Sequence, residues 1–343
     1  MNFIARLRAA ARILLKGESR KPTRDEIPPI TAGEVAEIRQ FFPREKFFIL
    51  GHARSGTTLL MRLARLHPEV HCNYQAHFFT RQPLLKTLVS APEAQEWLAR
   101  KSNRWNQGRD LSPLVLRAAA DIILERDAAR VGKRIVGDKS PSSTIHGQAV
   151  RDMYAVYPDA KLIYIVRDGR DVLISERFRN LVEESKFLRS EDRQIVAELR
   201  RTPDRFMDGT RSIFTEAVVR RVAAGWRKNL EETEAEGHRL FGGNYFSLRY
   251  EDLLRQPFDE MCKLWSFLGV RVDDTLQKSI LEEMASNPDE EWQSRRNGDL
   301  ASFLPKGQAG NWQRLFTARD KAIFKEVAGG MLVKWGYEDS ANW

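Results

Sequence analysis

Residues 47–58 read Phe-Phe-Ile-Leu-Gly-His-Ala-Arg-Ser-Gly-Thr-Thr, and this stretch decides the fold. The first four residues are apolar and predict a buried strand that ends at Gly51. A loop with Arg54 and Gly56 follows, and the apolar residues after it predict a helix over 57–66. In a strand–loop–helix unit of this kind, the N–H groups of the loop and the helix N-terminus converge on one point. The stretch therefore predicts a cradle for a phosphate or a similar anion.

The spacing Gly51-x4-Gly56-x-Thr58 matches the phosphate loop of nucleoside triphosphatases, with one change. Thr57 stands where those enzymes carry the lysine that binds the β- and γ-phosphates. The nearest fixed cation is Arg54, inside the loop. This combination favours a phosphate-bearing donor that is not a nucleoside triphosphate. An atypical P-loop kinase or NTPase is the alternative.

Periodicity predicts the rest of the architecture. Further strands are predicted at 134–137, 161–166 and 245–248, and helices at 112–130, 146–156, 171–182, 213–236, 257–268 and 318–334. Strands that alternate with helices indicate an α/β three-layer sandwich with a central parallel sheet. The segments 183–212 and 286–303 are charged and weakly periodic, and we expect them to be long, mobile loops that cover a site.

A second strand–turn–helix unit spans residues 160–175. Arg167 stands at the end of its strand, where α/β sheets bind ligands. Ser175 follows eight residues later, inside the predicted helix. A guanidinium offers a forked, charge-assisted pair of hydrogen bonds to a phosphate. Asp168 has a competing interpretation as the metal-binding acid of an NTPase.

The two units together resemble the sulfotransferases that use 3′-phosphoadenosine 5′-phosphosulfate (PAPS). The run Arg54-Ser55-Gly56-Thr57-Thr58-Leu59, with His67-Pro68 and Cys72 downstream, is most similar to the tyrosylprotein and carbohydrate branches. The resemblance implies a P-loop-like PAPS-binding core and no metal. It assigns the 5′-phosphosulfate to Arg54, Ser55, Gly56, Thr57 and Thr58, and the 3′-phosphate to Arg167 and Ser175.

Two further segments extend the resemblance over residues 47–312. Leu304-Pro305-Lys306-Gly307-Gln308-Ala309-Gly310-Asn311-Trp312 is similar to a family segment that folds over the 3′-phosphate. Lys306 and Gly307 match that segment, whereas Pro305 and Asn311 replace an arginine and an aspartate. Tyr250-Glu251-Asp252-Leu253 is similar to a family segment near the nucleotide, so Tyr250 is a candidate binding residue.

The implied reaction is in-line transfer of a sulfonyl group from PAPS to an acceptor hydroxyl or amine, which releases adenosine 3′,5′-bisphosphate. Arg54 and the loop N–H groups suit the charge that develops on the leaving phosphate. Lys139, in Gly137-Asp138-Lys139-Ser140-Pro141, matches a family lysine near the transferred group.

The general base is where this sequence departs from the family. The position of the family's glutamate is occupied by Gln75, and an amide cannot accept a proton. His77 is the leading candidate, because a histidine is suited to this work near neutral pH. His146 competes with it, and Glu251, Asp138 and Asp168 are weaker candidates. The lost glutamate and arginine also leave open a catalytically degenerate nucleotide-binding protein.

Composition limits the partners. The 343 residues carry a net charge of +9, which implies an anionic partner, but no nucleic-acid-binding motif is present. Small-molecule, carbohydrate and lipid acceptors all fit, and the oligomeric state is left open. No apolar run is long enough to span a membrane and no signal peptide is evident. With only Cys72 and Cys262, a reducing cytoplasm is the simplest compartment.

Residues 1–30 form a separate unit in this interpretation, and the sulfotransferase-like domain covers 31–343. Apolar residues at helical spacing alternate with basic ones over 1–21, and three prolines follow. This pattern is typical of a basic amphipathic helix that lies on an anionic membrane. A helix that packs on its own domain or on a partner chain has the same pattern.

Overall fold

The computed structural model describes residues 27–81, 84–144, 146–183, 188–286, 307–340 and 343. The predicted amphipathic helix over 1–21, Lys306 and nearly all of the predicted loop at 286–303 lie outside these residues. Among the helices that the structure describes, none is long and apolar enough to cross a bilayer.

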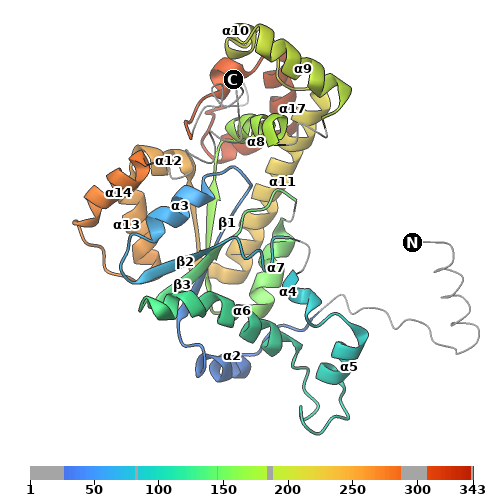
Figure 1. The fold of residues 1–343 in the computed structure, drawn as a ribbon, viewed down its shortest axis with the longest axis vertical. Helices are drawn as coiled ribbons and strands as arrows, with labels where there is room; N and C mark the ends of the chain where they lie inside the picture. Colours follow the sequence, from blue (N-terminus) through green and yellow to red (C-terminus); the bar gives the residue numbers. More distant parts are fainter. Residues whose placement is uncertain (1–26, 82–83, 145, 184–187, 287–306, 341–342) are drawn as a thin grey trace, which may run out of the picture.

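Five parallel strands form a single sheet (Figure 1). Their order is β2-β3-β1-β4-β5, so the strand that leads into the phosphate loop lies at the centre. The strands are β1 (Glu45–Gly51), β2 (Val70–Tyr74), β3 (Ile135–Lys139), β4 (Lys161–Val166) and β5 (Tyr245–Arg249). The register pairs Ile49 with Lys139 on one side of β1 and Gly51 with Ile165 on the other.

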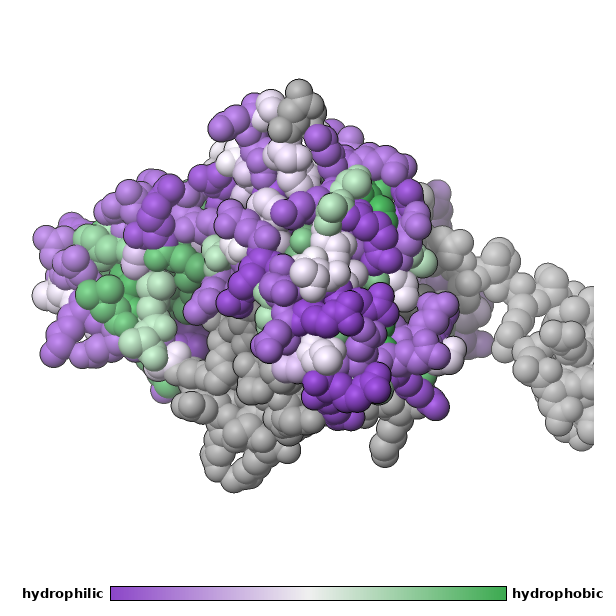
Figure 2. All heavy atoms as spheres, turned by 90° about the horizontal axis from the view of Figure 1, so that it is seen from above, coloured by the Kyte–Doolittle hydropathy of each residue, from purple (hydrophilic) through white to green (hydrophobic). Residues whose placement is uncertain are grey.

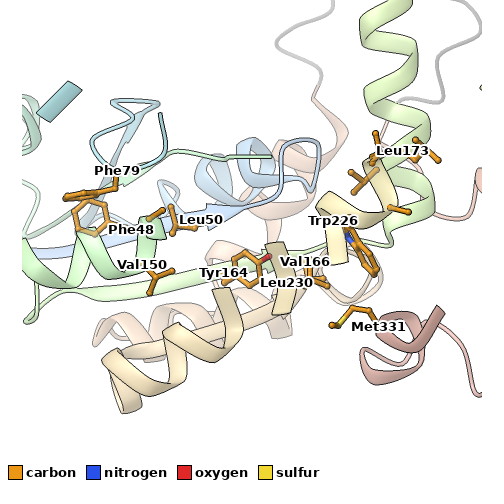
Figure 3. Close-up of a cluster of buried hydrophobic side chains, with 14 of the residues drawn as sticks. Phe48, Leu50, Phe79, Val150, Tyr164, Val166, Leu173, Trp226, Leu230 and Met331 are labelled. Carbon is orange, nitrogen blue, oxygen red and sulfur yellow. The ribbon is translucent and has the colours of Figure 1, made fainter. Parts of the chain in front are cut away.

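Alternation along β1 builds the two hydrophobic cores. Phe48 and Leu50 point to one face and join the larger cluster, which includes Tyr164, Val166 and Trp226 (Figure 3). Helices α6 (Ser112–Arg130), α7 (Gly147–Val156), α8 (Gly169–Glu183), α11 (Glu216–Phe241) and α17 (Ala318–Lys334) contribute to this cluster. Phe47 and Ile49 point to the other face, which is covered by α3 (Thr57–Ala64), α13 (Pro257–Leu268) and α14 (Leu276–Ala285). The predicted three-layer α/β sandwich is therefore confirmed.

The seven predicted helices and four predicted strands are all present, with shifts of a few residues at their ends. The sequence reasoning missed β2, a five-residue strand at the edge of the sheet, although the alternation of apolar and polar residues in Val-His-Cys-Asn-Tyr was the available signal. The expected start of a helical stretch at Tyr250 is confirmed by α12 (Tyr250–Arg255). The other short helices were missed, and these are α2 (Ala32–Arg39), α4 (Leu84–Thr87), α5 (Pro92–Ala99), α14 and α16 (Trp312–Leu315).

The prediction of a long loop over 183–212 is wrong. Two helices occupy most of this segment, α9 (Ser190–Arg201) and α10 (Asp204–Met207). Ile195, Val196 and Leu199 are buried in the larger core, and their spacing forms one apolar stripe on α9. The stripe was hidden by the charged residues around it, so the segment is a packed part of the domain.

The face seen from above is mainly hydrophilic (Figure 2). Apolar residues gather on its left, over the lobe that α3 and α12–α14 form (Figures 1 and 2).

Candidate active site

The predicted site segments meet at one edge of the sheet, because all five strands are parallel and end on the same side. Across this edge lie the turn after β2, Lys139 at the end of β3, the loop after β1, Arg167 after β4 and Tyr250 after β5. Ligands of open α/β sheets bind in this position. The topology thus brings together residues that are almost 200 positions apart in the sequence, since the loop after β1 begins at His52 and the last of these residues is Tyr250.

The loop between β1 and α3, called the phosphate loop, has a backbone that tolerates only a small residue at position 56. Gly56 caps α3 with a φ of 86°, and a Cβ there would lie 2.2 Å from the ring of Tyr250. Arg54 also adopts a positive φ, 73°. The Ser55 N–H donates to the carbonyl of His52 at 3.2 Å, while the Ser55 hydroxyl oxygen is buried.

Arg167 joins three of the predicted segments. Its Nη1 donates to the carbonyl of Arg54 at 3.1 Å, and its Nη2 donates to the carbonyl of Gln308 at 2.9 Å. Its guanidinium carbon lies 4.8 Å from the centre of the Tyr250 ring. Arg54 in turn donates from Nε to the Ser175 hydroxyl at 3.0 Å. The two predicted anion-binding units are therefore in direct contact.

The segment 307–312 is held against this pair by Asp171, which the sequence reasoning did not select. Its carboxylate accepts from the N–H of Gly310 at 2.6 Å and from that of Trp312 at 3.1 Å. The Tyr250 hydroxyl donates to the carbonyl of Gly307 at 2.7 Å. Burial raises the pKa of Asp171, and the nearby Arg167 opposes this effect. The position of Asp171 at the start of α8 was the available signal, because acids favour a helix N-terminus.

Lys139 is fully buried at the end of β3, beside the phosphate loop. Its Nζ donates to the Thr58 hydroxyl at 3.2 Å and lies 3.7 Å from the centre of the Tyr74 ring. Tyr74 itself is 57% exposed, so its ring separates the ammonium group from solvent. The sequence reasoning missed Tyr74 because it missed β2, which positions it.

The turn at 75–77 is strained and closely held. Gln75 and His77 have φ values of 58° and 53°, in a region that residues with side chains rarely adopt. The Asp138 carboxylate accepts from the Ala76 N–H at 2.9 Å, and the Ser140 hydroxyl accepts from the His77 N–H at 2.9 Å. The residues on either side of Lys139 thus fix the turn that carries both Gln75 and His77.

His77 is buried, and its Nδ1 lies 2.8 Å from the Thr80 hydroxyl. Burial, together with the charges of Arg81 and Lys139, lowers the pKa of His77 to about 4. His146 precedes α7, and its Nδ1 lies 3.3 Å from the Asn229 amide nitrogen. Burial also lowers the pKa of His146. Both imidazoles are therefore neutral at pH 7.

The three weaker base candidates are engaged in structural contacts. Arg170 donates to both carboxylate oxygens of Asp168, at distances down to 2.7 Å. Glu251 accepts from the Asp168 N–H at 3.0 Å and from the Tyr337 hydroxyl at 3.0 Å. Asp138 accepts from Ala76 and from the Ser140 hydroxyl. Each of the three carboxylates therefore has a structural role, since it holds a neighbouring segment in place.

Unsatisfied buried atoms mark the same region. In the described part of the chain, five buried side-chain polar atoms have no hydrogen-bond partner. Three of them are Ser55 Oγ, Arg167 Nε and His77 Nε2. Buried polar groups normally find partners, so such a concentration needs an explanation. A hydroxyl and a guanidinium beside a Gly-containing loop fit an anionic ligand such as a nucleotide phosphate.

Comparison with known proteins identifies the protein family. A model of the sulfotransferase family matches residues 46–274, more than half of the chain. The chain therefore belongs to the sulfotransferase family. Protein-tyrosine sulfotransferase 2 of Gallus gallus is 23% identical over 273 residues, which cover 78% of this chain and 62% of that protein. Sulfotransferase 1C2 of Homo sapiens is 33% identical over 89 residues, 23% of this chain and 30% of that protein. The match thus spans less than two thirds of either relative.

Solved structures with a similar arrangement include mouse sulfotransferase SULT7A1 complexed with PAP, with a TM-score of 0.46 and 16% identity over 87% of this chain and 86% of the other. Retinol dehydratase in a complex with retinol and PAP has a TM-score of 0.47 and 16% identity over 91% and 98% of the two chains.

Proposed function

We propose that this protein is a PAPS-dependent sulfotransferase that acts on an acceptor hydroxyl or amine. The observation that carries the proposal is the contact between the two anion-binding units, through Arg167, Arg54 and Ser175. Two anion sites in contact at one sheet edge suit a donor with two separate phosphate groups. PAPS is such a donor, because its 5′-phosphosulfate and 3′-phosphate are both attached to one ribose.

The proposal assigns the residues as follows. Ser55, Gly56, Thr57, Thr58 and the loop N–H groups receive the 5′-phosphosulfate, and Arg167 with Ser175 receives the 3′-phosphate. Lys306 and Gly307 belong to the segment that closes over the 3′-phosphate, although Lys306 lies outside the described residues. Tyr250 supports this arrangement, since its ring lies against Arg167 and its hydroxyl binds Gly307.

When bound, PAPS supplies a sulfonyl group attached to a phosphate leaving group. Arg54 and the loop N–H groups oppose the negative charge that develops on this phosphate. Lys139 is assigned to the bridging oxygen, since its ammonium already reaches the Thr58 hydroxyl. As the bond from sulfur to the acceptor oxygen or nitrogen forms and the S–O bond to the phosphate breaks, the acceptor proton moves to a base.

His77 is the proposed base. When Nδ1 donates its proton to Thr80, the lone pair of Nε2 stays available, and this atom has no hydrogen-bond partner among the described residues. The low pKa keeps the ring neutral and able to accept a proton at pH 7. Gln75 stands on the same turn and suits a binding role toward the acceptor, because its amide both donates and accepts hydrogen bonds.

The acceptor is proposed by class only. Small molecules, carbohydrates and lipids fit the sequence, and the names of some relatives add protein tyrosines. A phenol or alcohol panel, a sugar panel and a tyrosine peptide, each assayed with labelled PAPS, would separate these classes.

One titration tests the donor. Calorimetry with adenosine 3′,5′-bisphosphate, adenosine 5′-phosphate and Mg-ATP should show binding that depends on the 3′-phosphate and is indifferent to Mg²⁺. Preference for Mg-ATP would favour a P-loop kinase or NTPase instead. Nucleotide binding without turnover on the whole acceptor panel would favour a degenerate binding protein.

A further inference from the structure

Two tryptophans are displayed on the surface far from the sheet edge that carries the site. Trp97 lies on α5 and Trp105 on the loop that follows it. Their side chains stack with centroids 5.0 Å apart and ring planes at 27°, yet they are 61% and 51% exposed. A stacked indole pair that keeps this much contact with water is unusual, because tryptophan is a large apolar side chain that is highly buried on average.

These two side chains lie on residues 97–109, which we call the tryptophan loop. Its order comes from Asn106, which is buried and donates from its amide to the carbonyls of Leu98 at 3.1 Å and Arg109 at 2.9 Å. The Asn106 side-chain oxygen accepts from the Gly108 N–H at 3.1 Å. Leu98 is the residue that packs into the core. Leu98 and Asn106 thus anchor the loop from inside, while the two indoles lie on its outer surface.

The tryptophan loop is also strongly basic. Four exposed cations lie within it, and they are Arg100, Lys101, Arg104 and Arg109, whereas its acidic neighbours are Glu96 directly before it and Asp110 directly after it. Arg100 contacts Glu96 at 3.5 Å and Arg109 contacts Glu37 at 3.9 Å. Both pairs are about half exposed, so water and salt weaken them and the positive potential of the loop persists.

Other exposed apolar residues concentrate in the same part of the chain. Apart from the two indoles, nine large hydrophobic residues are exposed in the described part, and seven of them lie between residues 41 and 131. One of the seven, Tyr74, covers Lys139 in the active site. The seven also include Val115, Ile122 and Ile123 on α6, against which α5 packs. Helices α2, α5 and α6 lie together at the lower end of the molecule in Figure 1.

We propose that the tryptophan loop is a docking site for anionic lipid bilayers. An indole is suited to the bilayer interface, because its ring is apolar and its N–H is polar. The neighbouring cations are attracted by anionic headgroups. A second copy of the chain is disfavoured as the occupant, because a self-complementary contact would bring the same cations together on molecules that each carry a charge of +9. This site is independent of the proposed activity and of the sequence-based membrane prediction for residues 1–21.

The test uses the full chain and measures its sedimentation with vesicles. One set of vesicles contains phosphatidylcholine alone, and the other contains about 30% phosphatidylserine, which gives the surface a negative charge. We expect binding to the anionic vesicles that weakens in high salt. The K101E/R104E variant should bind them roughly tenfold more weakly, because each cation near an anionic surface contributes substantially. W97S/W105S should also lose affinity, and this loss should persist at high salt.

Two matched controls lie on other elements. K228E/K278E makes the same change in net charge at exposed lysines of α11 and α14, and Leu281→Ser removes an apolar side chain that is 57% exposed. Both controls should bind anionic vesicles as the unaltered chain does. Quenching of tryptophan fluorescence by lipids brominated on their acyl chains gives a second readout, and it should be smaller for W97F/W105F.

Three outcomes would overturn the proposal. Equal vesicle binding by all variants would place any membrane contact elsewhere in the chain, residues 1–21 included. Equal quenching in W97F/W105F would show that these indoles do not enter the bilayer. If the loop variants lost self-association or binding to an acidic protein while their vesicle binding was unchanged, the loop would be a protein interface.

Discussion

The guanidinium of Arg167 donates a 3.1 Å hydrogen bond to the backbone carbonyl of Arg54, so the end of β4 is tied directly to the phosphate loop after β1. A second bond from the same side chain reaches Gln308, while its Nε is buried without a partner among the described residues. The arginine is therefore fixed in place by two carbonyls, and its remaining N–H groups, with Nε–H among them, can bind a ligand. This is the arrangement expected of a preformed phosphate-binding group.

Arg167→Ala should weaken binding of adenosine 3′,5′-bisphosphate far more than binding of adenosine 5′-phosphate. A charge-assisted hydrogen bond contributes about 1.5–3 kcal/mol, so we expect a loss of about ten- to a hundredfold for the bisphosphate. Calorimetry with both nucleotides measures the difference. Arg220→Ala, on the outer face of α11, is the control and should change neither affinity. Equal losses for the two nucleotides would show that Arg167 does not recognise the 3′-phosphate.

Lys139→Met removes the ammonium group and keeps most of the buried apolar volume. Turnover should fall about a hundred- to a thousandfold, which is the typical effect in other enzymes of removing one hydrogen-bond donor to a developing charge. Affinity for adenosine 3′,5′-bisphosphate should change little, because this product lacks the transferred group. Single-turnover kinetics at saturating PAPS gives the rate of the chemical step. Lys161→Met, at the opposite end of the sheet, should leave that rate unchanged, and a full-rate Lys139→Met enzyme would remove the lysine from the mechanism.

Gly56→Ala should destabilise the domain and weaken nucleotide binding. The added Cβ would lie 2.2 Å from the Tyr250 ring, at a φ of 86° that costs alanine about 1–2 kcal/mol on its own. Thermal unfolding with and without adenosine 3′,5′-bisphosphate measures both effects. Gly33→Ala, in α2 with open space around it, should be neutral or slightly stabilising. A Gly56→Ala protein as stable as Gly33→Ala would mean that Tyr250 does not lie against the loop.

The local parts of this site could be predicted from the sequence, and the contacts between them could not. The runs at 47–58 and 160–175 each contain a strand, a turn and a helix, so neighbouring residues suffice to recognise an anion-binding unit. The contacts of Gly56 with Tyr250 and of Asp171 with Gly310 join residues 194 and 139 positions apart, counted from their sequence numbers, and depend on the order of the strands.

Two local features also escaped prediction, for a different reason. Tyr74 follows polar residues on the edge strand β2, where one side of the ladder has no partner and the apolar signal is weak. Helix α9 has a narrow apolar stripe among many charged side chains. Val70 and Cys72 of β2, like the apolar stripe of α9, owe their burial to tertiary packing, which the local pattern only suggests.

The pH dependence of turnover tests the proposed base. A lowered pKa disfavours the imidazolium form, so His77 stays neutral above a pH of about 4, whereas an ordinary histidine is half protonated near 6.5. At saturating PAPS, kcat should therefore hold from pH 8 down to about 5 and fall only on further acidification.

His77→Ala should reduce kcat by about 10²–10⁴ and spare nucleotide affinity. His146→Ala is the matched control, since His146 is a second histidine whose pKa is lowered by burial, and it should retain turnover. Full activity in His77→Ala with loss in His146→Ala would transfer the role to His146, and an acid limb near 6.5 would show that the base is an imidazole with an ordinary pKa.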